Sequence, residues 1–365
     1  MANKRNKMWL ITLTAMMCVF VAVSFLAGCK TTTAATAAAE TTAVSETKTV
    51  TTTAAETTPA ATTSAETTAA TETTAAETTA EATTSAETTA ATETTAVNSV
   101  VFTNERLSVT GSTTTLEVSQ LWAEAFMAKF GGQITISGGG SGVGIADLIN
   151  KTNDLTNSSR AIKSTEVDKA KAAGVDVKEY KVLLDGIAIV TSKNINIPEL
   201  TLNQMADIYI GNITNWKEVG GPDAPILAIA RDSSSGTGEF FLQKVVQLNQ
   251  TNTNDYSVNA LRLQSNADIV NQVEANDNAI GYIGMGYLKD AGSKVNLIKV
   301  KFADNTPSIG PTSQTVADFS YPISRYCYIY ANGAKFSKIA KAYLDFVLSP
   351  EGQDIVVKAG FVKVK

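Results

Sequence analysis

The stretch PILAIARDSSSGTGEFFLQKVVQL, residues 225–248, decides the fold, because a loop of hydroxyl residues and glycines joins a short apolar run to an amphipathic segment. The apolar run is typical of a buried strand, and the amphipathic segment is typical of a helix. Between them stand Arg231 and a run of serines, threonine and glycines that ends at Gly238. Guanidinium groups and the backbone N–H groups at the start of a helix favour anions. The stretch therefore predicts a strand–loop–helix unit with a site for a small anion.

Two earlier stretches repeat this design. GSTTTLE (111–117) and GGGSGVGIADL (138–148) each follow a strand-like run and lead into a segment with helical spacing of its apolar residues. Taken alone, each loop could be an ordinary capped helix behind a flexible turn. Three such loops together favour one site built from all of them. The alternation of strands with helices along 98–365 predicts an α/β fold.

Several classes of function conflict with the composition. The chain contains no histidine, so the usual general base, the common nucleophile pairs and the commonest zinc ligand are absent. No loop matches the GxxxxGK[ST] pattern of nucleotide-binding proteins. Basic and acidic residues nearly balance in 98–365, with no basic stripe for nucleic acid. We therefore expect a binding protein rather than an enzyme, with no cofactor and no metal ion.

The first 28 residues have the pattern of a secretory signal peptide, since basic residues precede a largely apolar run over 8–25. The segment LAGC (26–29) resembles the bacterial lipobox, whose cysteine carries the lipid and becomes the mature N-terminus. We therefore predict removal of 1–28 and lipid attachment at Cys29, which anchors the protein at the outer face of the cell membrane. The alternative is an uncleaved membrane helix, because the run is close to the lower limit for spanning. Cys327 is predicted to be a small buried hydrophobe.

The segment 29–97 consists almost entirely of Thr, Ala and Glu. Within it AETTPAATTSAETTAATETTA (55–75) recurs with two substitutions at 76–96. This repeat has no Leu, Ile or Phe to bury, so it cannot offset the entropy of ordering. We interpret the segment as a disordered linker, a spacer through a cell-wall layer.

The region 106–365 resembles a known family. The motifs GSTTT, GGGSGVGI, DLTNSSRAIKSTE, DGIAIV, RDSSSGTGEFF, AIGYIGMGYL and SPEGQ occur in this order over 106–365. With the lipobox, they resemble the phosphate-binding lipoproteins of bacterial phosphate ABC transporters, the PstS family. The resemblance implies an α/β, two-lobed fold of the periplasmic-binding-protein type (type II), in which each lobe is a mixed sheet flanked by helices and two strands form the hinge. It also implies a monomer that captures inorganic phosphate and delivers it to ABC permease subunits.

The resemblance implies ligand contacts at matching positions. These are Ser112 and Thr113 in the first loop, Ser141 in the second, and Arg231, Ser235, Gly236 and Thr237 in the third.

One position departs from the family pattern. Many members place an aspartate, which accepts the proton of hydrogen phosphate, where this chain has Ser159. Rejection of sulfate then requires another acceptor, and Asp185 is our candidate; the alternative is a surface carboxylate at the end of a strand. Arg160 is either a second guanidinium of the site or a salt-bridge partner on its rim.

The two lobes are predicted as 98–190 with 322–365, and 191–321, with crossings near 191–193 and 319–322. Binding of another tetrahedral oxyanion, such as sulfate or molybdate, is the closest alternative function. A surface adhesin that reuses the fold is an alternative from another class, although the near-neutral charge gives it no support.

Overall fold

The computed structural model describes residues 101–364, which belong to one compact unit, Ala90–Lys365. The predicted signal peptide 1–28, the lipid attachment at Cys29 and the linker 29–97 lie outside the described residues. No helix within 101–364 is long and apolar enough to cross a membrane.

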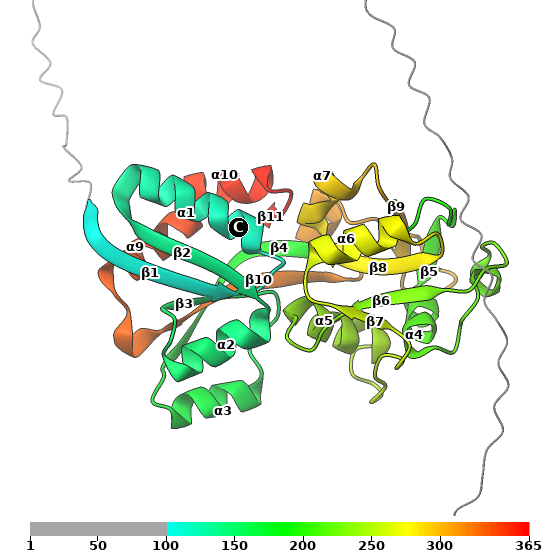
Figure 1. Cartoon of the computed structure of the whole chain (residues 1–365), viewed down its shortest axis with the longest axis horizontal. Helices are drawn as coiled ribbons and strands as arrows, with labels where there is room; N and C mark the ends of the chain where they lie inside the picture. The colour runs from blue at the N-terminus through cyan, green and yellow to red at the C-terminus, as the bar shows by residue number, and fades with distance from the viewer. Residues whose placement is uncertain (1–100, 365) are drawn as a thin grey trace, which may run out of the picture. The chain divides into compact units, whose positions relative to one another are not determined.

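The first half of the fold is a mixed sheet with helices on both faces (Figure 1). Its strands follow the order β2-β1-β3-β10-β4; β1 runs parallel to β2 and β3, whereas β10 is antiparallel to β3 and β4. The strands are β1 (Phe102–Gly111), β2 (Gly131–Gly139), β3 (Leu155–Ser158), β4 (Val177–Thr191), β10 (Ser324–Asn332) and the short β11 (Val362–Lys363), which pairs with β4. Helices α1 (Leu116–Phe130), α9 (Lys338–Leu348) and α10 (Pro350–Lys358) cover one face, and α2 (Ser141–Asn150) and α3 (Ser164–Ala172) cover the other.

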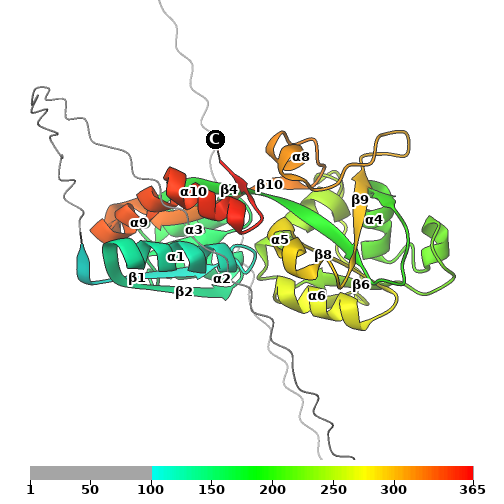
Figure 2. The ribbon, with the colours of Figure 1, turned by 90° about the horizontal axis from the view of Figure 1, so that it is seen from above.

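The second half continues from β4 through β8 and β6 (Figure 2), and β7 follows β6 in the sheet. Its strands are β5 (Glu199–Thr201), β6 (Leu227–Arg231), β7 (Leu261–Leu263), β8 (Ala279–Gly284) and β9 (Asn296–Lys301). Strand β6 is parallel to β7 and β8, and β4 is antiparallel to β8 and β9, so this sheet is also mixed. The helices are α4 (Leu202–Ile210), α5 (Gly236–Phe241), α6 (Asn266–Ala275), α7 (Leu288–Ala291) and α8 (Ser313–Ala317). The predicted α/β fold with two mixed sheets is confirmed.

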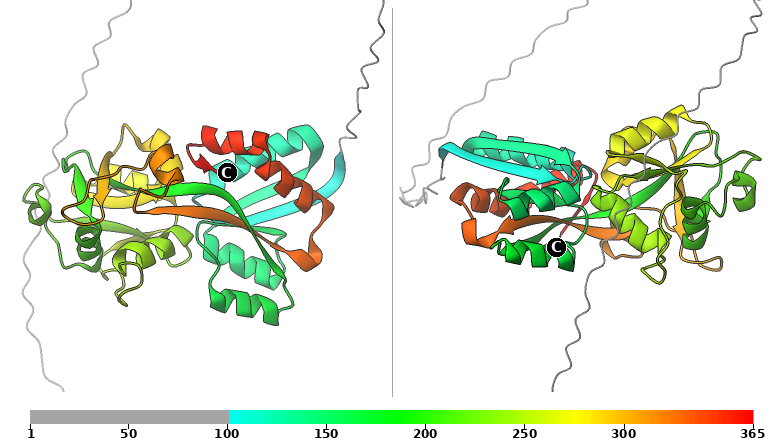
Figure 3. Two further views of the ribbon diagram at one scale, coloured as in Figure 1. Left: turned by 180° about the vertical axis from the view of Figure 1, so that it is seen from behind. Right: turned by 60° about the horizontal axis from the view of Figure 1, so that its bottom comes forward.

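Two strands connect the halves, as both views in Figure 3 show. Strand β4 pairs with β10 up to Gly186 and with β8 from Ile187 onward. The chain returns through Ile323, whose carbonyl accepts a hydrogen bond from the backbone N–H of Ile187 at 3.0 Å. The change of partner in β4 precedes the predicted crossing at 191–193. All residues of β4 from Val182 to Thr191 are buried, so the strand continues through this point without interruption.

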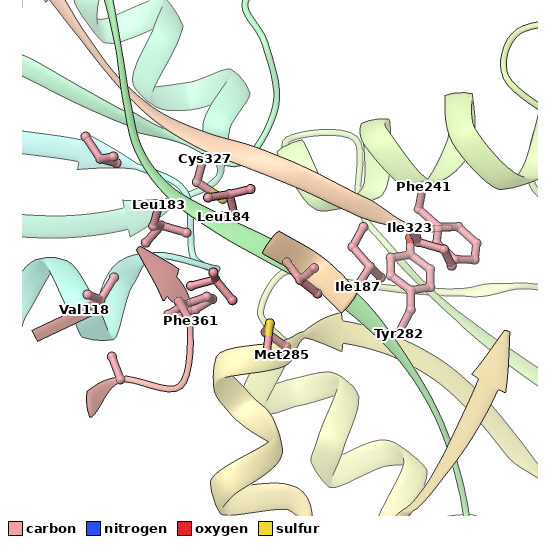
Figure 4. Close-up of a cluster of buried hydrophobic side chains, with 14 of the residues drawn as sticks. Val118, Leu183, Leu184, Ile187, Phe241, Tyr282, Met285, Ile323, Cys327 and Phe361 are labelled. Atoms are coloured by element: carbon pink, nitrogen blue, oxygen red, sulfur yellow. The ribbon is translucent and has the colours of Figure 1, made fainter. Parts of the chain in front are cut away.

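The core continues through this connection (Figure 4). Leu183, Leu184 and Phe361 belong to it in the first half, and Ile187, Ile323 and Tyr282 belong to it in the second. Cys327 of β10 lies fully buried among them, which confirms its prediction as a small buried hydrophobe. Burial raises the pKa of its thiol far above the ordinary value, so the group stays protonated and unreactive.

Candidate anion-binding site

The three loops predicted from the sequence meet between the two halves. Nη2 of Arg231, at the end of β6, donates a hydrogen bond to Thr113 Oγ1 at 2.6 Å, in the loop before α1. The hydroxyls of Thr114 and Thr237 lie 2.5 Å apart. The backbone N–H of Gly142 donates to the Ser234 carbonyl at 2.9 Å, which joins the loop after β2 to the loop after β6. Loops that lie far apart in the sequence thus form one cluster of donors.

Gly236 allows the closest approach of the loops. A Cβ atom at this position would lie 2.2 Å from Ser141 Oγ and 2.9 Å from Ser159 Oγ. Both distances are far below van der Waals contact, so a side chain here would push the loops apart. The hydroxyls of Ser141 and Ser159 are themselves 3.3 Å apart, and Ser159 Oγ is 3.3 Å from Thr237 Oγ1. Glycine at 236 therefore lets the hydroxyls of Ser141, Ser159 and Thr237 lie within one small volume.

Arg231 is the main positive charge at this cluster. Its side chain is fully buried, and burial lowers the pKa of the guanidinium. Nε donates to the carbonyl of Leu263 at 3.3 Å, and Nη2 also donates to the carbonyl of Gln264. Within 101–364, Nη1 has no hydrogen-bond partner and no acidic side chain forms a salt bridge with Arg231. A buried, unneutralised cation with a spare donor is costly unless an anion binds it.

A second buried arginine, Arg325 of β10, also reaches the cluster, and the sequence analysis missed it. Its Nη1 donates to the Ser159 carbonyl at 2.8 Å, and its Nη2 donates to Thr237 Oγ1 at 2.8 Å. Arg325 thus bonds to both halves of the molecule. The available signal was a single arginine in the otherwise apolar and aromatic run YPISRYCYIY.

Asp185 of β4 lies directly opposite Arg325 in the sheet and is fully buried, so its interpretation as a surface carboxylate is wrong. Its Oδ2 accepts from Nε and Nη2 of Arg325 at 3.0 and 2.6 Å, and its Oδ1 accepts from the backbone N–H of Met285 at 2.9 Å. Burial raises the pKa of this carboxyl, and the guanidinium of Arg325 opposes the rise. A carboxylate offers about four acceptor positions, so these three bonds leave one on Oδ1.

Arg160 is a salt-bridge partner. Its Nη1 and Nη2 donate to the two carboxylate oxygens of Glu166 at 2.8 and 2.7 Å, and Nη1 also donates to the Ala161 carbonyl. Burial opposes ionisation of Glu166, but the hydrogen bonds from Arg160 and the Lys163 backbone outweigh it and hold the pKa of Glu166 below its ordinary value. The guanidinium is therefore neutralised within the first half.

The remaining predicted residues shape the loops. Ser112 Oγ accepts from the backbone N–H of Thr114 at 3.1 Å, and Ser235 Oγ accepts from that of Gly238 at 3.1 Å. Ser141 Oγ accepts from the backbone N–H of Ser159 at 3.0 Å. Thr114, which was not among the predicted ligand residues, is the residue of GSTTT whose hydroxyl contacts that of Thr237.

The chain is similar in sequence to known proteins. The sequence matches the PBP superfamily domain over residues 36–351. The phosphate-binding protein PstS of Borreliella burgdorferi is 33% identical over 238 residues, which cover 64% of this chain and 80% of the relative. The chain belongs to the PstS family. PstS of Staphylococcus saprophyticus is 34% identical over 245 residues, covering 64% of this chain and 73% of the relative.

Solved structures of phosphate-binding and phosphate-transport proteins have the same fold. One from Clostridium perfringens, described as a phosphate ABC transporter substrate-binding protein with bound phosphate, has a TM-score of 0.63 and 37% identity, and covers 72% of this chain and 100% of its own. An ABC-type phosphate transport receptor from Vibrio cholerae has a TM-score of 0.57 and 26% identity, covering 71% and 100%. The predicted two-lobed, periplasmic-binding-protein type of fold is confirmed.

Proposed function

We propose that this member of the PstS family captures inorganic phosphate between its two halves and delivers it to the permease subunits of an ABC transporter. The observation that carries the proposal is Arg231, a buried guanidinium that has no carboxylate partner among residues 101–364 and keeps a spare donor at Nη1. The hydroxyl of Thr113, from the first half, accepts a hydrogen bond from this guanidinium, and the hydroxyls of Thr114 and Thr237 meet between the halves. The names of the relatives support phosphate over sulfate, molybdate or adhesion, because PstS of Borreliella burgdorferi and of Staphylococcus saprophyticus are named phosphate-binding proteins and the Vibrio cholerae protein is described as a phosphate transport receptor.

The proposed ligand set combines donors with one acceptor. The donors from the first half are Ser112, Thr113, Ser141 and Ser159, to which we add Arg325. The donors from the second half are Arg231, Ser235, Gly236 and Thr237. Asp185 supplies the acceptor for the proton of hydrogen phosphate through its remaining position on Oδ1. Sulfate carries no such proton, so it would face the Asp185 carboxylate without a hydrogen bond between them.

We propose that the halves act as lobes that close over the anion, with residues 101–186 and 324–364 in one and 187–323 in the other. The hinge consists of the two connecting strands, at Gly186–Ile187 and Ile323–Ser324. This placement follows the change of pairing in β4. An anion that accepts hydrogen bonds from both lobes favours the closed state.

We further propose that the protein is anchored at the cell membrane by a lipid. Removal of 1–28 and lipid attachment at Cys29 would hold a monomer at the outer face of the membrane, with 29–97 as the linker. Cys29→Ser should then abolish incorporation of labelled fatty acid and release the protein. Incorporation that persists in this variant contradicts the lipobox assignment. We expect no enzymatic activity, because a chain without histidine lacks the usual general base.

Isothermal titration calorimetry tests the function directly. Residues 30–365, freed of bound phosphate by unfolding and refolding, would be titrated with phosphate, arsenate, sulfate and molybdate. We expect phosphate and arsenate to bind, because both carry a proton at neutral pH, and sulfate and molybdate to bind far more weakly. Binding of sulfate as tight as that of phosphate contradicts the proposal.

A further inference from the structure

Two buried tyrosine hydroxyls connect the two ends of the anion loop, which we define as residues 231–238. The backbone N–H of Arg231 donates to the hydroxyl of Tyr282 at 2.9 Å. The hydroxyl of Tyr256 donates to the carbonyl of Gly238 at 2.8 Å, and the two hydroxyls lie 2.7 Å apart. The anion loop is thereby closed on itself through two side chains that belong to other elements.

The direction of this chain of hydrogen bonds is fixed. A phenol has one proton to donate, and that of Tyr256 is used on the Gly238 carbonyl, which can only accept. Tyr282 must therefore donate to Tyr256 while it accepts from Arg231. Every donor and acceptor in the chain is matched, and burial raises the pKa of both phenols, so neither ionises at physiological pH.

Packing holds both rings in place. Tyr282 of β8 stacks on Phe241 with ring centroids 3.9 Å apart and an interplanar angle of 5° (Figure 4). Tyr209 of α4 meets both Tyr282 and Tyr256 edge-on, at 5.6 and 5.9 Å. Rings fixed in this way leave the hydroxyls little freedom, so a hydrogen bond to them fixes the partner as well.

The two ends of the anion loop carry the groups that the proposed function needs. Arg231 supplies the guanidinium, and Thr237, next to Gly238, supplies the hydroxyl that contacts Thr114 and Arg325. We propose that Tyr282 and Tyr256 are positioning residues of the phosphate site, which hold Arg231 and Thr237 at the spacing that one anion requires. This inference rests on the proposed function.

Removal of single hydroxyls tests the inference. Tyr282→Phe and Tyr256→Phe keep the rings and delete only the chain of hydrogen bonds. Tyr209→Phe is the matched control, because Tyr209 belongs to the same aromatic cluster and its hydroxyl bonds to the Ile229 carbonyl at 3.4 Å, outside the anion loop. We expect the Kd for phosphate to rise about 3- to 10-fold in both test variants, the equivalent of one hydrogen bond, and to stay within about twofold in the control.

A second readout separates positioning from general stability and does not depend on the ligand. Amide hydrogen exchange of 235–238 in residues 30–365 should accelerate in Tyr282→Phe and in Tyr256→Phe, but not in Tyr209→Phe. If Tm falls in the two test variants while their Kd for phosphate and their loop exchange match those of Tyr209→Phe, the inference is overturned. If Arg231→Ala left phosphate binding unchanged, the proposed function would fail, whereas loop exchange would still report on the two tyrosines.

Discussion

Asp185 and Arg325 face each other across the two strands that connect the halves of the molecule, with Asp185 Oδ2 and Arg325 Nη2 2.6 Å apart and both side chains buried. A second buried arginine, Arg160, is neutralised by Glu166. Of the three buried arginines in 101–364, Arg231 is therefore the one without a carboxylate. Burying a charge without a partner is costly, so the unpaired cation marks where an anion binds.

The first prediction concerns this charge. Arg231→Ala should weaken phosphate binding about 30- to 4,000-fold, because loss of one partner of a buried charge pair costs about 2–5 kcal/mol. Arg231→Lys should recover only part of the loss, since an ammonium lacks the planar fork of the guanidinium. Calorimetric titration measures both, with Arg106→Ala on the exposed side of β1 as the control. An Arg231→Ala protein that binds within about twofold of the wild type contradicts the assigned site.

The second prediction concerns discrimination between phosphate and sulfate. Asp185→Asn should weaken phosphate about 10-fold or more, because an amide can donate where the ligand also donates. The ratio of the Kd for sulfate to the Kd for phosphate should become smaller. Because the change also leaves Arg325 without its counter-charge, we expect a lower Tm as well.

Glu166→Gln is the matched control for Asp185→Asn. It removes the carboxylate from the other buried arginine pair, and among the hydrogen bonds of 101–364 neither Arg160 nor Glu166 bonds to the anion loop. It should lower Tm but leave the ratio of the two dissociation constants unchanged. If Asp185→Asn also preserves that ratio, Asp185 is not the acceptor.

The sequence was sufficient for the parts of the site that are local. Each of the three loops carries its own pattern of glycines and hydroxyls between a strand and a helix, so the loops could be predicted one at a time. The pair Asp185–Arg325 could not, because its members are 140 residues apart and meet only through the register of β4 with β10. The roles of Tyr256 and Tyr282 depend on hydroxyl positions in a packed cluster, which no spacing in the sequence encodes.

The third prediction concerns an ion pair that bridges the proposed lobes. Nζ of Lys163, which precedes α3, lies 3.0 Å from the carboxylate of Glu239 in α5. If the lobes open and close as proposed, this pair forms only in the closed state. Lys163→Glu should therefore weaken phosphate about 2- to 10-fold, since an exposed pair contributes at most about 1 kcal/mol and like charges add repulsion.

The charge swap of Lys163→Glu with Glu239→Lys should restore most of this loss, and the effect should shrink at high salt. Lys217–Asp223 offers the control, because it has the same 3.0 Å separation but lies within one lobe. Lys217→Glu should leave the Kd for phosphate unchanged. If Lys163→Glu and Lys217→Glu change the Kd for phosphate equally, the pair Lys163–Glu239 has no part in closure.

The fourth prediction concerns closure itself and depends on Gly236. An alanine Cβ at this position would meet Ser141 Oγ of the other lobe at 2.2 Å, whereas nothing in the backbone conformation of Gly236 excludes alanine. Gly236→Ala should therefore tolerate the open state and oppose the closed one. We expect phosphate binding about 5- to 150-fold weaker, in line with the usual cost of overpacking, and a Tm without ligand close to that of the wild type.

Small-angle X-ray scattering provides the measurement. Saturating phosphate should reduce the radius of gyration of residues 98–365 in the wild type and in Gly310→Ala, where the nearest atom to an added Cβ is 3.9 Å away. Gly236→Ala should show a smaller reduction, even at phosphate concentrations that saturate its weakened site, because its lobes cannot meet at Ser141. A radius that phosphate leaves unchanged in the wild type contradicts closure over the ligand. Full compaction in Gly236→Ala shows that the loops adjust to the added methyl group and that Gly236 does not limit their approach.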